Sequence, residues 1–413
     1  MGNALEQVVE PQQHSRDVVQ SVADQQQRNI AVDAYRGLVM LLMMGEVLQL
    51  SRLSSLYPDN GFLGILAFNQ THVPWAGMSL HDTIQPGFTF LVGVALPYSL
   101  RSRRRKGESF RRMLLHTMWR SLVLVALGIF LRSTYSPMTN FTFEDTLTQI
   151  GLGYTFAFLL AFARPRWQWI AFSAILFGYW LAWAVYPAPG PHFDWAAVGV
   201  TPDFQRHLFT GFAAHWNKNS NLGQAFDVWF LNLFPRPSRF IYNDGGYLTL
   251  SFIPTLGTML MGLAAGRWFQ EAAPKIPLRK FLLAGLGFCA AGLLLHFTGV
   301  CPIVKRIWTP SWTLFSGGVC FFFLAALSWI VDVRKHHRLA FPLVVVGMNS
   351  IAAYVMAELS RNFIMSSFRI NLGPTVLSVF GPRLETAFAA VLTMCVYWLV
   401  LFWMFRKRIF VRI

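Results

Sequence analysis

Residues 101–131 read RSRRRKGESFRRMLLHTMWRSLVLVALGIFL, in which seven basic side chains within 101–112 lead directly into an apolar stretch. About 20 apolar residues are enough for a helix to cross a bilayer, and basic residues beside such a helix hold that end in the cytoplasm. This stretch therefore predicts a membrane-spanning helix over 113–131 whose N-terminal end faces the cytoplasm.

The composition of the whole chain agrees with a membrane protein. Of the 413 residues, 54% are hydrophobic and 13% are charged, about half the charged fraction of an ordinary soluble domain. These values exclude a soluble globular enzyme, a disordered chain and a collagen-like chain. The net charge of +16 gathers at the ends of apolar stretches, so we expect no nucleic-acid partner.

The same pattern recurs along the chain and predicts an all-α fold, a polytopic membrane bundle of about ten helices. Residues 1–29, which are polar and rich in Gln, are expected to be a disordered cytoplasmic tail, and 30–413 to form the transmembrane domain. The expected spans are 32–50, 82–99, 113–131, 146–163, 167–186, 249–267, 280–298, 311–331, 340–358 and 385–405.

The basic residues also predict the orientation. With both termini in the cytoplasm, 22 of the 35 Lys and Arg residues lie on the cytoplasmic side and 11 on the outer side, as the positive-inside rule requires. Two long outer segments result, 51–81 and 187–248. The second is rich in Trp, His and Pro, which suits an extracytoplasmic cap.

Polar residues inside spans are informative because each must be paired or face water. Asp33 and Arg36 share one face of the first span, either as a local ion pair or as part of an anion site. Arg120 stands about 12 Å beyond Arg112, where it either reaches back to the interface or binds a phosphate from the cytoplasm.

Other polar candidates cluster toward the outer side. Glu46, near the outer end of the first span, is either a general base or an acid bonded to a neighbouring helix. The segment 69–82 reads NQTHVPWAGMSLHD, a turn-rich stretch in which Asp82 or Ser79 suits a helix cap. Its His72 is either an acid–base or acyl-transfer group or a surface residue.

Two further features have simpler interpretations. His81 is expected to be a surface residue. Asn349 lies within the ninth expected span, where a contact between helices is the default reading, and Gly262 with Gly266 forms a GxxxG helix-packing motif. The four Cys residues are widely spaced, so we expect neither a disulfide framework nor a metal site.

Five strings of the sequence resemble a known family. They are AVDAYRGLVMLLMM (31–44), HVPWAGMSLHDTIQPGFTFLVGVAL (72–96), MWRSLVLVALGIFLRS (118–133), IWTPSWTLFSGG (307–318) and FPLVVVGMNSIAAYV (341–355). In this order they are similar to the membrane domain of the heparan-α-glucosaminide N-acetyltransferase family and its uncharacterised bacterial relatives. The His-x-x-Trp-x-Gly-x-x-x-x-Asp string at 72–82 is the most specific part.

The resemblance implies a membrane-bound acyltransferase. Its members transfer an acetyl group from cytoplasmic acetyl-CoA, the co-substrate, across the membrane to the amine of a terminal glucosamine, and His72 falls on the active-site histidine. Together with the polar residues described above, the resemblance leads us to assign roles to seven residues. They are His72 and Glu46 for catalysis, Trp75, Asp82 and Asn349 for the substrate, and Arg36 and Arg120 for acetyl-CoA.

Two departures from the family leave the acceptor open. Glu46 stands where the family usually has Asn, and Thr148-Gln149 stands where it has Gln-Arg. The sequence does not decide whether His72 takes the acetyl group covalently or deprotonates the acceptor with help from Glu46. A transporter or flippase for a sugar or lipid-linked precursor is the alternative function, and a membrane scaffold a weaker one.

The expected partners follow from this interpretation. They are membrane lipid and an extracytoplasmic glycan or amino sugar, and the chain is compatible with a homo-oligomer. The expected location is a bacterial inner membrane.

Overall fold

The computed structural model describes residues 29–411, and in them all regular structure is helical except one isolated bridge between Ala76 and Val304. The predicted all-α fold is confirmed. The predicted tail lies outside the described residues except for Asn29. That residue is ordered as the N-cap of the first helix, because its side-chain oxygen accepts a hydrogen bond of 3.1 Å from Val32 N.

Each predicted span coincides with at least one helix. The long helices are α2 (Ile30–Met44), α5 (Ile84–Arg105), α6 (Phe110–Ser133), α7 (Thr146–Ala161), α8 (Pro165–Val185), α11 (Phe252–Ala272), α12 (Leu278–Phe297), α13 (Pro310–Ser328), α14 (His337–Gly347), α15 (Ser350–Leu377) and α16 (Glu385–Arg406). Short helices occupy the loops: η1 (Gly45–Leu48), α3 (Leu50–Leu56), α4 (Gly61–Gln70), η2 (His81–Thr83), α9 (Pro202–Gln205) and α10 (Leu222–Phe230).

The predicted count of ten spans is not confirmed. Within residues 29–411, six helices are long and apolar enough to cross a membrane, and the bent pair α14–α15 would make a seventh. The prediction of one continuous span over 340–358 is wrong, because α14 and α15 meet at a bend of 63°. Asn349 lies in this break, and its side chain hydrogen-bonds to the backbone of Ile409 and Val411.

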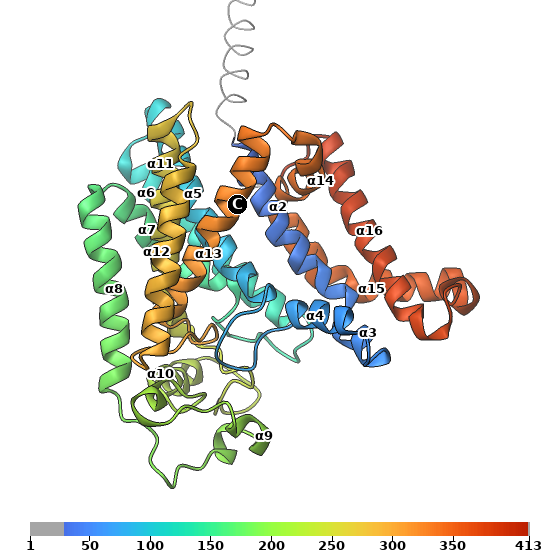
Figure 1. Ribbon diagram of the computed structural model, residues 1–413, viewed down its shortest axis with the longest axis horizontal. Helices are drawn as coiled ribbons and strands as arrows, with labels where there is room; N and C mark the ends of the chain where they lie inside the picture. The colour runs from blue at the N-terminus through green and yellow to red at the C-terminus, as the bar shows by residue number, and fades with distance from the viewer. Residues whose placement is uncertain (1–28, 412–413) are drawn as a thin grey trace, which may run out of the picture.

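The helices form two groups around a buried centre. Figure 1 shows α5–α8 and α11–α13 together on one side and α2 with α14–α16 on the other. The apolar window of α11 is 83% buried, whereas that of α12 is only 17% buried. We conclude that α11 is the central helix and that α12 turns much of its surface toward lipid.

Glycine allows α5 and α11 to approach closely. A Cβ added at Gly262 or Gly266 would overlap the backbone oxygen of Phe90 or Val94 on α5, and one at Gly93 would overlap that of Met259. The helix-packing role predicted for Gly262 and Gly266 is therefore confirmed. This contact fixes α5, whose first turn follows Asp82, against the centre of the bundle.

Residues 187–248, which we call the cap, lie across one end of the bundle (Figure 1). Side chains from the cap, α8 and two loops share one apolar cluster beneath it: Trp75, Tyr179, Trp183, Trp216, Leu248, Cys301, Val304 and Ile307. We call this end of the bundle the cap end. The opposite end, where α5 stops at Arg105 and α6 begins at Phe110, is called the basic end.

The close approach of α5 and α11 gives a test of the fold. We expect Gly262→Ala to lower the stability of the purified protein by about 1–3 kcal/mol, because the new methyl group must push the α5 backbone away. Thermal unfolding in detergent micelles measures the loss. Gly287→Ala on α12 is the matched control, since a Cβ there meets no heavy atom within 4 Å; equal melting temperatures for the two variants would contradict the packing.

Candidate active site

His72 lies in a short loop between α4 and η2 that is bonded at several points. Asn69 Oδ1 accepts a hydrogen bond of 3.1 Å from Leu80 N, and Gly77 N donates to Ile303 O at 3.1 Å. Gly77 has a φ of +108°, a conformation that favours glycine. The loop is thus held both to itself and to the segment between α12 and α13.

Asp82 is the centre of this arrangement, and its carboxylate is almost fully buried. Its Oδ2 atom accepts hydrogen bonds from Val73 N (3.3 Å), Ser79 N (3.0 Å) and Ser79 Oγ (3.0 Å). Its Oδ1 atom lies 2.7 Å from His72 Nδ1 and 3.2 Å from Lys305 Nζ. All lone pairs of the carboxylate are directed at donors, which a buried charge requires.

The Asp82 contact can set the chemistry of His72. When Nδ1 carries the proton, it donates to Asp82 and leaves a lone pair on Nε2. Serine hydrolases orient their catalytic histidine with a buried aspartate in this way. His72 is therefore suited to act as a general base or nucleophile through Nε2.

Lys305 is a buried cation in the segment between α12 and α13. Its side chain is 6% exposed, and its Nζ atom lies 3.0 Å from His72 Nδ1 as well as near Asp82. Burial lowers the pKa of Lys305, and the neighbouring Arg306 lowers it further, whereas Asp82 raises it. In its ammonium form Lys305 balances the charge of Asp82 and disfavours a second positive charge on His72.

The pKa of His72 is lowered below its ordinary value. Burial of the ring is the largest cause; the positive charge of Lys305 adds to it, while the hydrogen bond to Asp82 acts in the opposite direction. The imidazole is therefore neutral at pH 7, as a base or nucleophile must be.

A second carboxylate–imidazole pair lies beside the first. His81 Nε2 is 3.0 Å from Glu46 Oε1, and the ring centroids of His81 and His72 are 4.6 Å apart. The expectation that His81 is a surface residue is wrong, because its side chain is 7% exposed. The Glu46 side chain, by contrast, is 49% exposed.

The cap contributes the wall opposite these residues. The Tyr247 ring lies 6.4 Å from that of His72, and Arg306 stacks over Tyr247 with its guanidinium carbon 5.2 Å from the ring centroid. Arg306 also donates to Gly245 O at 2.7 Å and to Val73 O at 3.4 Å. The cap is thereby joined to the His72 loop at the site itself.

Of the predicted catalytic and substrate residues, the structure brings His72, Glu46 and Asp82 together. It places Trp75 and Asn349 in other surroundings. Asp82 contacts His72 and is too buried to face a substrate. Trp75 is 1% exposed and its Nε1 donates to Trp216 O at 3.1 Å, so it anchors the cap. Asn349 bonds to the C-terminal segment instead of joining this cluster.

The predicted acetyl-CoA residues are also engaged elsewhere. Arg36 pairs with Asp33 at 3.2 Å. Arg120 donates to Tyr154 OH at 3.3 Å and stacks on that ring. Neither residue lines a basic cavity of about 490 Å³ at the basic end, which is bounded by Pro97, Leu100, Arg101, Arg104, Arg105, Ala161, Leu263, Arg267 and Gln270.

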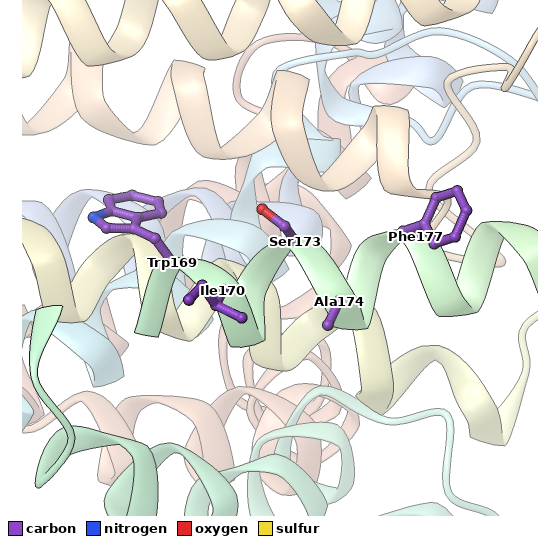
Figure 2. A pocket seen from close by; sticks show the side chains of 5 residues that line it. All are labelled: Trp169, Ile170, Ser173, Ala174 and Phe177. Carbon is purple, nitrogen blue, oxygen red and sulfur yellow. The ribbon is translucent and has the colours of Figure 1, made fainter. Parts of the chain in front are cut away.

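A second hollow has a different character. Figure 2 shows its lining, in which Trp169, Ile170, Ser173, Ala174 and Phe177 all project from α8. Because the lining is apolar apart from one hydroxyl and all of it belongs to the surface of one helix, we assign this hollow to lipid contact.

Sequence reasoning missed several residues of the site. Lys305 carried one signal: together with Arg306 it interrupts the apolar residues of the string CPIVKRIW at 301–308. The arginines of the basic cavity were interpreted only as orientation signals. These arginines line one cavity with Arg267 of α11 only because α5 packs against α11, and this packing cannot be read from the sequence.

Two known proteins are similar to this chain in sequence. No family model matches the chain. The heparan-alpha-glucosaminide N-acetyltransferase of Homo sapiens is 24% identical over 381 residues, which cover 83% of this chain and 54% of that protein. The protein of the same name from Mus musculus is 23% identical over 372 residues, which cover 80% of this chain and 53% of the mouse protein.

The chain is a distant relative of these N-acetyltransferases. The resemblance found in the sequence motifs is confirmed at this level. The chain spans about half the length of the N-acetyltransferases it matches.

The charges around His72 predict its titration. We expect His72 to lose its proton below pH 6.5, the ordinary value, and Lys305→Met to move this titration to higher pH, because the variant removes a positive charge 3.0 Å from the ring. The pH dependence of carbethoxylation, resolved by mass spectrometry, measures it because only neutral imidazole reacts.

His192, an exposed cap histidine, serves as the internal control, and its extent of carbethoxylation should be the same in both proteins. An unchanged His72 titration in folded Lys305→Met would contradict the electrostatic role of this lysine. Lys305→Gln provides the same test if the Met variant does not fold.

Proposed function

We propose that this protein is a membrane-bound acyltransferase. It moves an acetyl group from cytoplasmic acetyl-CoA to an amino sugar or related glycan on the extracytoplasmic side. In this proposal the cap end faces outward and the basic end faces the cytoplasm. The integral-membrane character rests on the apolar helices, and a bacterial inner membrane is the proposed location.

The observation that carries the proposal is the buried Asp82 beneath His72. The contact of 2.7 Å between Asp82 Oδ1 and His72 Nδ1 fixes the ring and leaves Nε2 for chemistry. Such a pair suits acyl transfer, where a base or nucleophile must act on a carbonyl carbon. Distant similarity to two N-acetyltransferases supports acetyl as the transferred group.

The basic cavity fits the phosphate groups of acetyl-CoA. Arg101, Arg104 and Arg105 of α5 and Arg267 of α11 surround it, and guanidinium groups bind phosphate in bidentate geometry. Gln270 Nε2 is buried there and has no hydrogen-bond partner in the described part of the chain. A bound phosphate or ribose oxygen would satisfy this donor.

The two regions lie along the same helix. α5 begins two residues after Asp82 and reaches Arg101 about 25 Å later, at 1.5 Å per residue. A nucleotide held in the basic cavity would therefore leave the pantetheine arm to extend along α5 toward His72. The polyanionic part need not enter the apolar centre of the bundle, where unpaired charge is costly.

His72 Nε2 serves both routes that remain open. In one route it attacks the thioester carbonyl carbon and carries the acetyl group; in the other it takes a proton from the acceptor nitrogen as that nitrogen attacks. In each route the acetyl carbon–sulfur bond breaks and CoA leaves as the thiol. Membrane lipid and the extracytoplasmic acceptor are the proposed partners, and a homo-oligomer remains compatible with them.

Removal of His72 tests the proposal. In detergent micelles with acetyl-CoA and a panel of amino sugars, we expect wild-type protein to release CoA, and His72→Ala to lose at least about 100-fold, the low end for a general base. His207→Ala in the cap is the matched control. Full activity of His72→Ala would refute the proposed role. Uptake of a sugar into proteoliposomes that contain the protein, without CoA release, would favour a transporter.

The basic cavity gives a separate test. We expect Arg104→Gln and Arg267→Gln each to raise the KM for acetyl-CoA by about tenfold, because each removes a charge-assisted hydrogen bond worth about 1.5–3 kcal/mol, while kcat changes little. Initial rates at varied acetyl-CoA measure the effect, with Arg166→Gln on α8 as the control. Unchanged KM values in both variants would place the nucleotide elsewhere.

A further inference from the structure

The second carboxylate–imidazole pair is not needed for a transfer that moves one proton. His72 with Asp82 can accept a proton from the acceptor and deliver it to the leaving sulfur. Glu46 and His81 nevertheless lie in contact with this pair, through His81 and His72 rings whose centroids are 4.6 Å apart. Two elements meet to form the second pair, η1 at the end of α2 and η2 at the start of α5.

An ammonium acceptor has two protons to lose. The balanced reaction is R–NH3⁺ + CH3CO–SCoA → R–NH–COCH3 + CoASH + H⁺. The nitrogen–carbon bond forms and the carbon–sulfur bond breaks; one of the two protons that leave nitrogen ends on sulfur, and the other goes to solvent. A hydroxyl acceptor would release no proton to solvent.

We infer that Glu46 is the base that removes the first proton from an ammonium acceptor, with His81 as its positioning residue. This inference rests on the proposed function and assigns its acceptor class to this pair. Glu46 takes the proton and releases it to solvent. His72 then handles the second proton, which passes from the nitrogen to the sulfur.

The exposures of the two side chains fit these roles. The Glu46 side chain is 49% exposed and can meet both an acceptor and water, whereas the His81 side chain is 7% exposed. His81 Nε2 lies 3.0 Å from Glu46 Oε1 and fixes the direction of the carboxylate. His81 therefore acts through Glu46.

The charges facing Glu46 come from several elements and include both signs. Lys305 and Arg361 are cations that disfavour an ammonium at the site and so ease its deprotonation. The Glu358 carboxylate acts in the opposite direction, because it stabilises the ammonium form. The groups around the pair are His72, Asp82, Lys305, Glu358 and Arg361, with Tyr397 of α16 beside the last two.

The test is the pH dependence of kcat/KM for glucosamine, measured by CoA release from the full chain in detergent micelles. In wild-type protein we expect kcat/KM to level off near neutral pH. In Glu46→Gln only the free amine formed in solution can react, so we expect about a 100-fold loss at pH 6, where an amine with a pKa of about 8 is about 1% unprotonated. This loss should diminish tenfold for each pH unit up to the pKa of the amine.

Companion variants separate this role from a structural one. Glu46→Asp should restore the wild-type profile in part, and His81→Asn should give a smaller loss with the same recovery at high pH. Asp59→Asn, an exposed carboxylate between α3 and α4, is the matched control and should behave as wild type. With 4-aminophenyl glucoside, whose amine is neutral at pH 7, the loss in Glu46→Gln should nearly vanish.

The outcomes distinguish this inference from the proposed function. If wild-type protein releases CoA but Glu46→Gln and His81→Asn keep the wild-type pH profile, the second base is refuted and the transferase stands. A pH-independent loss in both variants refutes it as well, because a structural defect would not recover as the amine loses its proton. If wild-type protein releases no CoA with any acceptor, both proposals fail.

Discussion

A single buried carboxylate, that of Asp82, determines the arrangement around His72. It binds two backbone amides of its own loop, the Ser79 hydroxyl, the His72 ring and the Lys305 ammonium. A buried carboxylate without such donors would be strongly unfavourable, so the loop and the segment between α12 and α13 must come together for the negative charge to be tolerated. The isolated bridge between Ala76 and Val304 lies beside this contact and reinforces it. The conformation of the His72 loop is therefore a consequence of neutralising one charge.

The same charge balance adds to the burial that lowers the pKa of His72. Asp82 and Lys305 offset one another, and a proton on the imidazole would add a second positive charge 3.0 Å from the Lys305 ammonium. A carboxylate beside a histidine ordinarily favours the protonated ring. Here burial of the ring, with the positive charge of Lys305 added to it, outweighs this tendency and lowers the pKa of His72, so that Asp82 orients His72 without protonating it. Orientation and basicity, which conflict in a simple Asp–His pair, are thereby separated.

The sequence predicted the helical membrane fold because apolar length and basic flanks are local properties. It predicted Glu46 as a candidate because a carboxylate within a span is polar where polarity is unfavourable, and His72 and Asp82 because they belong to a string that resembles a known family. It could not predict Lys305, which lies 233 residues from His72 along the chain, or the break at Asn349, where apolar residues continue on both sides. Arg101, Arg104 and Arg105 were visible in the sequence, but a cavity is formed only when α11 adds Arg267. Exposure of Glu46 and burial of His81 likewise depend on how η1 meets η2.

The positions of the basic cavity and of His72 are coupled through α5. Both are attached to this helix, one near each end, and the glycine contacts with α11 prevent it from tilting or sliding freely. The separation between a nucleotide bound at the arginines and the imidazole is therefore set by the length of the helix and by the bonded loop that holds His72. A donor with a long, thin arm suits such a site, because the charged portion can remain at the basic end while only the arm follows the helix. On the cap side of the site, the Trp75 indole joins the His72 loop to the cap. Glu46, whose side chain is half exposed, is the acidic group best placed to meet an acceptor.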